Sequence, residues 1–319
     1  MASEAGAPGA GATRAGDSKP GAKPSARLGQ GVSRRLGRRL GMIGDAVIVR
    51  HTLFSLPFAL VAILLETGGR LQPRPLLLIV LAAASARNAA NALNRVVDAE
   101  IDARNPRTAG RHLPTGRLSK RELLAFAGVM IALLVASAFM LNWLCVALLP
   151  VAAVLVGGYS YTKHFTWLCH YWLGVACAAA PMGAFVALAG RFEFRYFVLA
   201  GAVALWVAGF DILYALQDID FDRREGVRSI PARFGAPGAR AVSALSHAGT
   251  VAGLAALPLF WDLSWAYGAG VAIAAALLIA EHVVVRGGTE RHVRIASYSI
   301  NEVLPLVMLA ATALDVYLL

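Results

Sequence analysis

Charged residues are scarce in this chain of 319 residues, where Asp, Glu, Lys and Arg make up only 15%. Soluble domains typically contain about 25% charged residues, so this composition argues against a soluble fold and against a second, soluble domain. Hydrophobic residues make up 58% of the chain and gather in long runs. We therefore predict an all-α membrane protein with about nine transmembrane helices of roughly 20 residues each.

Cysteine is also rare, and the three examples are Cys145, Cys169 and Cys177. None has the C-x-x-C or Cys/His spacing of a zinc site, so we interpret them as thiols packed between helices. Acidic residues are outnumbered by basic ones, 19 to 30. In a membrane protein with many spans this excess is typical of loop charge that sets orientation, and no nucleic-acid partner is predicted.

The first 40 residues lack any apolar run, and they carry eight Lys or Arg against Glu4 and Asp17. This argues against a cleaved signal peptide, which needs an apolar core of about 7 to 15 residues. We predict that residues 1–44 form a disordered basic tail and that residues 45–319 form the transmembrane domain. A mitochondrial transit peptide stays open as an alternative for the tail.

The apolar runs give nine expected spans, whose charge pattern can be tested. They lie near residues 46–65, from 75 into the first acidic motif, 123–141, 144–161, 168–189, 197–217, 241–260, 263–285 and 296–318. With this count, the tail and the loops after the even-numbered spans share one side and hold 23 of the 30 Lys and Arg. The opposite loops hold only Arg70, Arg74, Arg191 and Arg195. Such asymmetry supports the count and predicts that the loops rich in Lys and Arg are cytoplasmic.

Polar residues follow one stripe of the second span, at steps of three and four: Arg87, Asn91, Asn94, Asp98 and Asp102. This spacing places them on one face of a helix. A polar stripe is costly in lipid, so it is expected to face a bundle interior or a central cavity. Two carboxylates four residues apart also repel each other, which predicts a positive group between them.

The same arrangement returns about 120 residues later, at Asp211, Tyr214, Asp218 and Asp222. In both copies the acid pair is followed by a loop rich in arginine and then by another apolar run. We interpret this as an internal repeat in which two acid pairs face one cavity.

Oxygen ligands without His or Cys favour Mg²⁺ or Ca²⁺. Mg²⁺ is typically bound by one or two carboxylates together with substrate phosphates, and arginines after each acid pair are suitable phosphate partners. The predicted substrate is a diphosphate that carries an apolar hydrocarbon group, such as a prenyl diphosphate. The predicted metal ligands are Asp98, Asp102, Asp218, Asp222 and Asn94; the predicted substrate ligands are Arg50, Asn94, Tyr214, Arg107, Arg111, Lys163, Arg224 and Arg228.

The motifs N-R-V-V-D-A-E-I-D from Asn94 and Y-A-L-Q-D-I-D-F-D from Tyr214 resemble those of the UbiA-type intramembrane prenyltransferases. The resemblance covers about residues 45–319. It implies a UbiA-like bundle of nine helices, two Mg²⁺ ions bridging the diphosphate, and prenyl transfer inside a lipid bilayer. Arg95 departs from the pattern, since many members have a second acid there; we expect it to bind a backbone carbonyl or to pair with Glu100.

Four further segments, beginning at His51, Asn105, Tyr159 and Ser229, resemble the 4-hydroxybenzoate polyprenyltransferase branch and, more narrowly, members assigned to menaquinone synthesis through futalosine. The resemblance implies an aromatic hydroxy acid as acceptor, such as 4-hydroxybenzoate or a dihydroxynaphthoate, in the inner membrane of a bacterium. Arg50 is predicted to bind the acceptor's carboxylate. Asp211 either orients the acceptor and takes its proton, or makes only an interhelical hydrogen bond.

Two other functions stay open from the sequence. One is a different prenyl transfer in the same superfamily, of the haem or chlorophyll type. The other is a cation-coupled secondary transporter, which can also have intramembrane carboxylates and an internal repeat. The clustered arginines disfavour a cation carrier, because they would repel its cargo.

Overall fold

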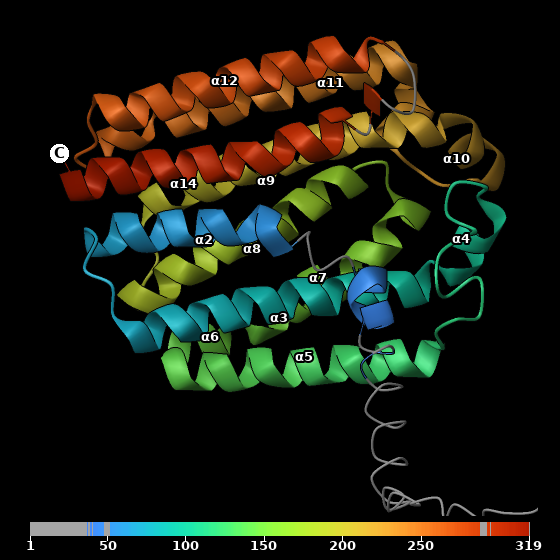
Figure 1. Ribbon diagram of the computed structural model, residues 1–319, viewed down its shortest axis with the longest axis horizontal. Helices are drawn as coiled ribbons and strands as arrows, with labels where there is room; N and C mark the ends of the chain where they lie inside the picture. The colour runs from blue at the N-terminus through green and yellow to red at the C-terminus, as the bar shows by residue number, and fades with distance from the viewer. Residues whose placement is uncertain are drawn as a thin grey trace, which may run out of the picture. The chain divides into compact units, whose positions relative to one another are not determined.

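The computed structural model describes residues 37, 39, 41–47, 52–287, 292, 293 and 295–318. Over these residues the regular structure is helical and contains no strand, which confirms the predicted all-α class. The long helices lie side by side in one bundle (Figure 1). The helices are α2 (Thr52–Thr67), α3 (Pro73–Val97), α4 (Ala99–Arg104), α5 (Lys120–Leu141), α6 (Trp143–Ala147), α7 (Leu149–Phe165), α8 (Cys169–Ala189), α9 (Phe194–Tyr214), α10 (Ile219–Glu225), α11 (Ile230–Ala255), α12 (Trp265–Val285) and α14 (Asn301–Leu318). Two short 3₁₀ helices (Ala215–Asp218 and Leu257–Leu259) and one π-helical segment (Ile295–Ile300) join them.

Seven helices in the described part of the chain are long and apolar enough to cross a membrane. The first expected span corresponds to α2, which has 16 residues, and the fourth to α7, which has 17. The fourth is shortened by a break: Asn142 caps the separate helix α6, and α7 begins anew at Leu149 with Pro150 in its first turn. Proline is favourable in the first turn of a helix. It lacks a backbone N–H, and the N–H groups of that turn have no hydrogen-bond acceptor within the helix. The count of nine spans therefore stays a prediction.

Ordered structure begins before the expected start of the membrane domain. The predicted disordered tail, residues 1–44, lies largely outside the described residues. Residues 42–47 are helical, and Ile43 and Val47 pack with Ala92 and Leu123 in one buried cluster.

Both acidic motifs lie where a helix is interrupted. Asp98 ends α3 and precedes α4, with φ −83° and ψ −1°. Likewise α9 ends at Tyr214, and the 3₁₀ turn Ala215–Asp218 leads into α10. α4 and α10 lie at the same end of the bundle (Figure 1), where Arg104 Nη1 and Glu225 Oε2 are 2.8 Å apart. Each predicted stripe is thus divided, and the second acid of each pair lies on its own short helix.

Helices α8 and α9 approach each other closely at Gly174. A methyl group on this residue would overlap the backbone carbonyl of Ala204 on α9. Glycine is therefore needed at this position for the two backbones to come so near. The contact matters for the cavity, because it sets the separation between side chains that α8 and α9 direct into it.

We expect Gly174→Ala to destabilise the protein by about 1–3 kcal/mol, the usual cost of overpacking. The measurement is the thermal unfolding midpoint in detergent. Gly128→Ala on α5 is the matched control, because its added methyl has open space around it. The control is expected to be neutral or slightly stabilising, since alanine favours helix over glycine by about 0.8–1.0 kcal/mol. An unchanged midpoint for Gly174→Ala would contradict the close contact.

Candidate active site

A cavity of about 850 Å³ is lined by residues of both acidic motifs. Most of its wall consists of apolar residues from α3, α7, α8 and α9. The predicted site residues that line it are Asn94, Asp98, Asp102, Arg107, Arg111, Lys163, Asp211, Tyr214, Asp218, Asp222 and Arg228. The two repeats therefore face one shared space, as their polar stripes predicted.

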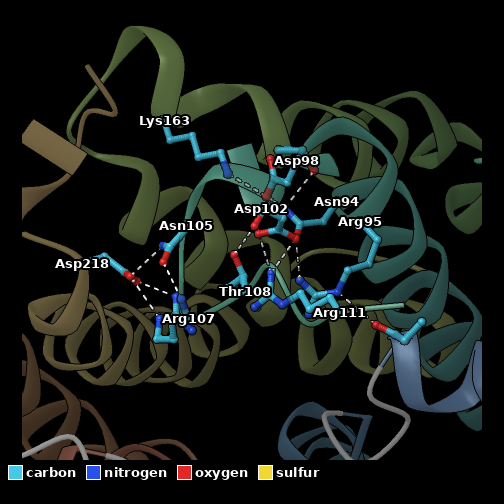
Figure 2. Close-up of polar contacts among 12 residues, drawn as sticks. Asn94, Arg95, Asp98, Asp102, Asn105, Arg107, Thr108, Arg111, Lys163 and Asp218 are labelled. Atoms are coloured by element: carbon cyan, nitrogen blue, oxygen red, sulfur yellow. Dashed lines mark hydrogen bonds and ion pairs between the residues drawn. The ribbon is translucent and has the colours of Figure 1, made fainter. Parts of the chain in front are cut away.

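The first acid pair is neutralised by cations from other segments (Figure 2). Lys163 Nζ on α7 lies 2.6 Å from Asp98 Oδ2, which also accepts a 2.8 Å hydrogen bond from Asn94 Nδ2. Arg111 Nη1 donates to both carboxylate oxygens of Asp102 at 2.7 Å. Asp98 and Asp102 are only 5% and 6% exposed, so each carboxylate needs a counter-charge.

The second acid pair is bound by the loop that follows the first. Arg107 donates to both oxygens of Asp218, from Nε at 3.0 Å and from Nη2 at 2.6 Å (Figure 2). Its Nη1 donates to Tyr214 Oη at 2.8 Å, and Asn105 Nδ2 donates to Asp218 Oδ1 at 3.0 Å. The repeats are thus interlocked, because a cation that follows one motif binds the acid of the other.

Asp222 has a different partner, the hydroxyl of Ser229, whose Oγ donates to Asp222 Oδ2 at 2.8 Å. Ser229 is also the N-cap of α11 and accepts from the backbone N–H of Ala232 at 3.2 Å. Within the described residues, no Lys or Arg lies at ion-pair distance from Asp222. This buried carboxylate is therefore open to a cation that the chain itself does not supply.

The remaining predicted cations differ in their placement. Arg228 lines the cavity, and its Nη1 donates at 2.7 Å to the carbonyl of the last residue of α7. Arg224 is exposed on α10 and is not among the cavity-lining residues. Arg50 lies outside the described residues. Arg95 donates from Nε to the carbonyl of Ala46 at 3.0 Å, which confirms the expected bond to a backbone carbonyl.

Two polar contacts in the cavity were not predicted from the sequence. Arg87 Nη1 lies 2.9 Å from Cys177 Sγ, and Arg87 Nε is buried without a hydrogen-bond partner in the described part of the chain. His170 Nδ1 lies 2.7 Å from Asp211 Oδ2. The position of Arg87 on the polar stripe was a usable signal, whereas nothing in the neighbouring sequence marked His170.

Part of the cavity wall is also outer surface of the bundle. Val151 on α7, Val175 on α8 and Phe197 on α9 line the cavity, and they are 53%, 49% and 53% exposed. Phe192, just before α9, also both lines the cavity and is exposed on the outer surface. Apolar side chains so exposed on a membrane helix face lipid, so the cavity borders the bilayer on this side.

The donor set suits a hard divalent cation completed by a substrate. Five carboxylates line the cavity, four of them from the two acid pairs, and Asp98 Oδ1 is buried with no hydrogen-bond partner within the described ranges. No group of three His, Cys, Asp or Glu in those ranges is close enough to hold a metal alone. Mg²⁺ fits this arrangement, because it is usually bound by one or two carboxylates, with phosphates and waters as its other ligands.

Several known proteins resemble this chain. A 4-hydroxybenzoate octaprenyltransferase from Xanthomonas euvesicatoria pv. vesicatoria (strain 85-10) is 36% identical over 200 residues, or 63% of this chain and 66% of that protein, just under two thirds of its length. The apo structure of a UbiA homolog from Aeropyrum pernix K1 is 33% identical with a TM-score of 0.77, covering 84% of this chain and 98% of that one. A UbiA homolog from Archaeoglobus fulgidus bound to GPP and Mg²⁺ shares the fold, at 18% identity and a TM-score of 0.61, over 85% of this chain and 99% of that one.

A sequence model described as the UbiA prenyltransferase family matches residues 55–301, well over half of the chain. The same residues contain both acidic motifs and the helices that carry them. This chain therefore belongs to the UbiA prenyltransferase family.

Proposed function

We propose that this protein transfers a polyprenyl group from a polyprenyl diphosphate to an aromatic hydroxy acid, with Mg²⁺, in quinone biosynthesis. The observation that carries the proposal is one shared, largely apolar cavity, into which two acid pairs and several cations converge at one end. Such a cavity suits a ligand with a diphosphate head and a hydrocarbon tail. The name of the Xanthomonas relative supports a 4-hydroxybenzoate type of acceptor.

In this proposal the diphosphate binds between the two motifs. Asp98, Asp102, Asp218 and Asp222 would hold Mg²⁺, with Asn94 beside them. When bound, Mg²⁺ supplies Lewis acidity that neutralises the departing diphosphate. Arg107, Arg111 and Lys163 lie close enough to exchange their carboxylate contacts for phosphate oxygens, and Tyr214 and Arg228 line the same region. The apolar wall excludes water from the allylic cation that forms as the carbon–oxygen bond breaks.

Within the described residues, the cation that we propose for the acceptor's carboxylate is Arg87; Arg50, for which the sequence predicted this role, lies outside them. Arg87 lines the cavity, and within the described residues its guanidinium has no carboxylate at ion-pair distance. It lies eleven residues before Asp98 on α3, which is roughly 16 Å deeper along the helix. An aromatic acid bound there would lie beyond the diphosphate, facing the prenyl carbon that is transferred.

Arg87→Ala is expected to raise the acceptor KM by about 10- to 100-fold, because hydrogen bonds to charged groups contribute about 1.5–3 kcal/mol. The donor KM should change little, since Arg87 is far from both acid pairs. Initial rates at varied acceptor and saturating donor measure the effect. Arg74→Ala, at an exposed position on the same helix, is the control. An unchanged acceptor KM would remove Arg87 from the acceptor site.

The proposed location is the inner membrane of a bacterium, with both acid motifs on the cytoplasmic side. The supporting observations are the concentration of Lys and Arg in the loops beside the motifs and the bacterial source of the relative. Cysteine accessibility labelling of Arg117→Cys and Trp143→Cys in intact cells tests it, because the first lies beside the motifs and the second at the other end of α5. Labelling of Arg117→Cys from outside the cell would contradict the orientation.

The function itself is tested by prenyl transfer with purified protein in liposomes. The reaction contains a radiolabelled polyprenyl diphosphate and Mg²⁺, with 4-hydroxybenzoate or 1,4-dihydroxy-6-naphthoate as acceptor. A prenylated product supports the reaction class, and the preferred acceptor distinguishes a ubiquinone-type from a menaquinone-type pathway through futalosine. Folded protein that prenylates neither acceptor would contradict the proposal and favour another prenyl transfer of the superfamily.

A further inference from the structure

The arginines that follow the second acidic motif carry positive charge that the chain does not neutralise. In the corresponding region of the first repeat, four cations each contact a carboxylate: Arg104, Arg107, Arg111 and Lys120. Within the described residues, no carboxylate lies at ion-pair distance from the five arginines of α10 and the first half of α11, which are Arg223, Arg224, Arg228, Arg233 and Arg240. This surface is therefore expected to attract anions.

One of these arginines, Arg233, lies over two aromatic rings. Its guanidinium carbon is 5.3 Å from the centroid of the Trp167 ring and 5.4 Å from that of Phe234. The two rings meet edge to face, with centroids 5.3 Å apart. A planar guanidinium can stack on aromatic rings and still donate hydrogen bonds to a phosphate. Arg233 is exposed, so the rings fix its position without removing it from a ligand.

A second arginine, Arg223, is fixed beside the same turn of α11. Its Nε donates at 2.9 Å to the carbonyl of Ala232, the residue before Arg233. Arg223 is also exposed, and only one of its nitrogens is used in this contact. Two guanidinium groups held at one helical turn suit a phosphate, because guanidinium binds phosphate oxygens through pairs of N–H groups.

Exposed apolar side chains adjoin these arginines. Phe165 at the end of α7, Leu168 just before α8, and Phe234 are 59%, 43% and 46% exposed. The loop with the first two is tied to the segment before α11, because Arg228 donates from Nη1 to the carbonyl of Phe165 and from its N–H to that of Lys163. Aromatic side chains are enriched where a membrane protein meets the headgroup layer. The surface therefore suits the boundary between headgroups and acyl chains.

We propose that Trp167, Arg223, Arg233 and Phe234 form a binding site for the headgroup of an anionic phospholipid. Its phosphate contacts the two arginines, and its acyl chains extend along Phe165 and Leu168. A phospholipid fits better than a soluble phosphate, because the exposed apolar side chains beside the arginines gain from contact with acyl chains. None of the four residues lines the cavity, so the lipid site is separate from the proposed substrate site.

Lipid binding is measured by native mass spectrometry of the purified protein in a neutral detergent. Phosphatidylglycerol should bind about tenfold more tightly than phosphatidylcholine with the same acyl chains, because the arginines favour an anionic headgroup. The double variant Arg223→Gln/Arg233→Gln should bind phosphatidylglycerol about 10- to 30-fold more weakly, since each arginine near an anionic surface contributes roughly fivefold. Phosphatidylcholine binding should not change. Unchanged phosphatidylglycerol binding by the double variant would overturn the proposal.

The matched control removes two exposed cations from the start of α5. Lys120→Gln/Arg121→Gln changes the net charge by the same amount as the double variant, but at a place without neighbouring stacked rings. This control should bind phosphatidylglycerol as tightly as the wild type. An equal loss in both double variants would mean that total charge alone attracts the lipid, and it would overturn a defined site.

The role of the rings is tested by Arg233→Lys. Lysine keeps the positive charge but has no planar group to stack on Trp167 and Phe234. We expect phosphatidylglycerol binding to weaken by about threefold or more, the size of an exposed contact between a cation and an aromatic ring. Binding as tight as that of the wild type would exclude the stacked arginine as part of the site.

Glycerol 3-phosphate distinguishes a lipid site from a site for soluble phosphate. A large excess should leave phosphatidylglycerol bound, because the soluble compound has no acyl chains. Displacement of the lipid would indicate a soluble phosphate ligand and overturn the proposal. These measurements need no prenyl transfer, so loss of the lipid site leaves the proposed function intact, and failure of prenyl transfer leaves the lipid site intact.

Discussion

Asp98→Asn and Asp218→Asn are each expected to lower prenyl transfer by about 10²–10³-fold or more, the usual effect of removing one group that stabilises developing charge. Each residue is the centre of the polar contacts in its motif: Lys163 and Asn94 meet at Asp98, and Arg107 and Asn105 meet at Asp218. Asparagine has nearly the same shape but carries no charge for a divalent cation. The loss should therefore appear in kcat and should not be overcome by more acceptor.

The matched controls are two acids in the same segments that point away from the cavity. Glu100 has an 86% exposed side chain, 3.7 Å from Lys120, and Asp220 is exposed on α10. Glu100→Gln and Asp220→Asn should keep near-normal rates. Radiolabelled product formation by all four variants, each checked for an intact thermal transition, measures the difference. Near-normal activity of Asp98→Asn or Asp218→Asn would contradict the metal assignment.

Chelation with EDTA is expected to abolish prenyl transfer and to leave the protein folded. The carboxylates already have internal counter-charges, since Lys163, Arg111 and Arg107 neutralise Asp98, Asp102 and Asp218 without a metal. Removal of Mg²⁺ should therefore stop the reaction while the thermal unfolding midpoint stays nearly constant. Added Mg²⁺ should restore the activity. An EDTA-treated enzyme that still forms product would exclude metal dependence.

The same ion pairs imply that Lys163 competes with the metal for Asp98. Lys163→Met should bind Mg²⁺ about 10- to 100-fold more tightly than the wild type when no diphosphate is present, because a charged hydrogen bond of about 1.5–3 kcal/mol no longer has to be broken. The variant should also bind the prenyl diphosphate more weakly, since it has lost a phosphate ligand. Titration calorimetry measures both affinities, and Lys120→Met, on the protein surface, is the control. Weaker Mg²⁺ binding by Lys163→Met would rule out competition.

The sequence was informative where function depends on local spacing. Apolar runs predicted the long helices, and the steps of three and four predicted that Asn94, Asp98, Tyr214 and Asp218 line a common cavity. Both features follow from the helical period of about 3.6 residues per turn, which can be recognised from the spacing of residues along the sequence. The narrower futalosine assignment depends on the acceptor, and neither the family match nor the helices decide it.

Contacts between helices distant in the chain were not predicted. His170 meets Asp211 because Gly174 lets α8 and α9 come close, and that separation depends on packing along both helices. The crossing of Arg107 from the first loop to Asp218 was missed for the same reason. The break between α6 and α7 inside the fourth span was also missed. Asn142, which caps α6, accepts from the N–H of Cys145 while its side-chain amide donates to carbonyls at the end of α8, a helix distant in the chain.

Part of the cavity wall is also lipid-facing surface. This affects the length of the prenyl tail that the enzyme can accept. A cavity of about 850 Å³ is within the range of pockets for drug-sized ligands, about 300–1,000 Å³, whereas a polyprenyl tail grows with every isoprene unit. Between Val151, Val175 and Phe197 the later units can lie among acyl chains, where they meet surroundings as apolar as the protein interior. The enzyme would then recognise the head and first units of its donor, and the rate of transfer would depend little on the number of isoprene units beyond them.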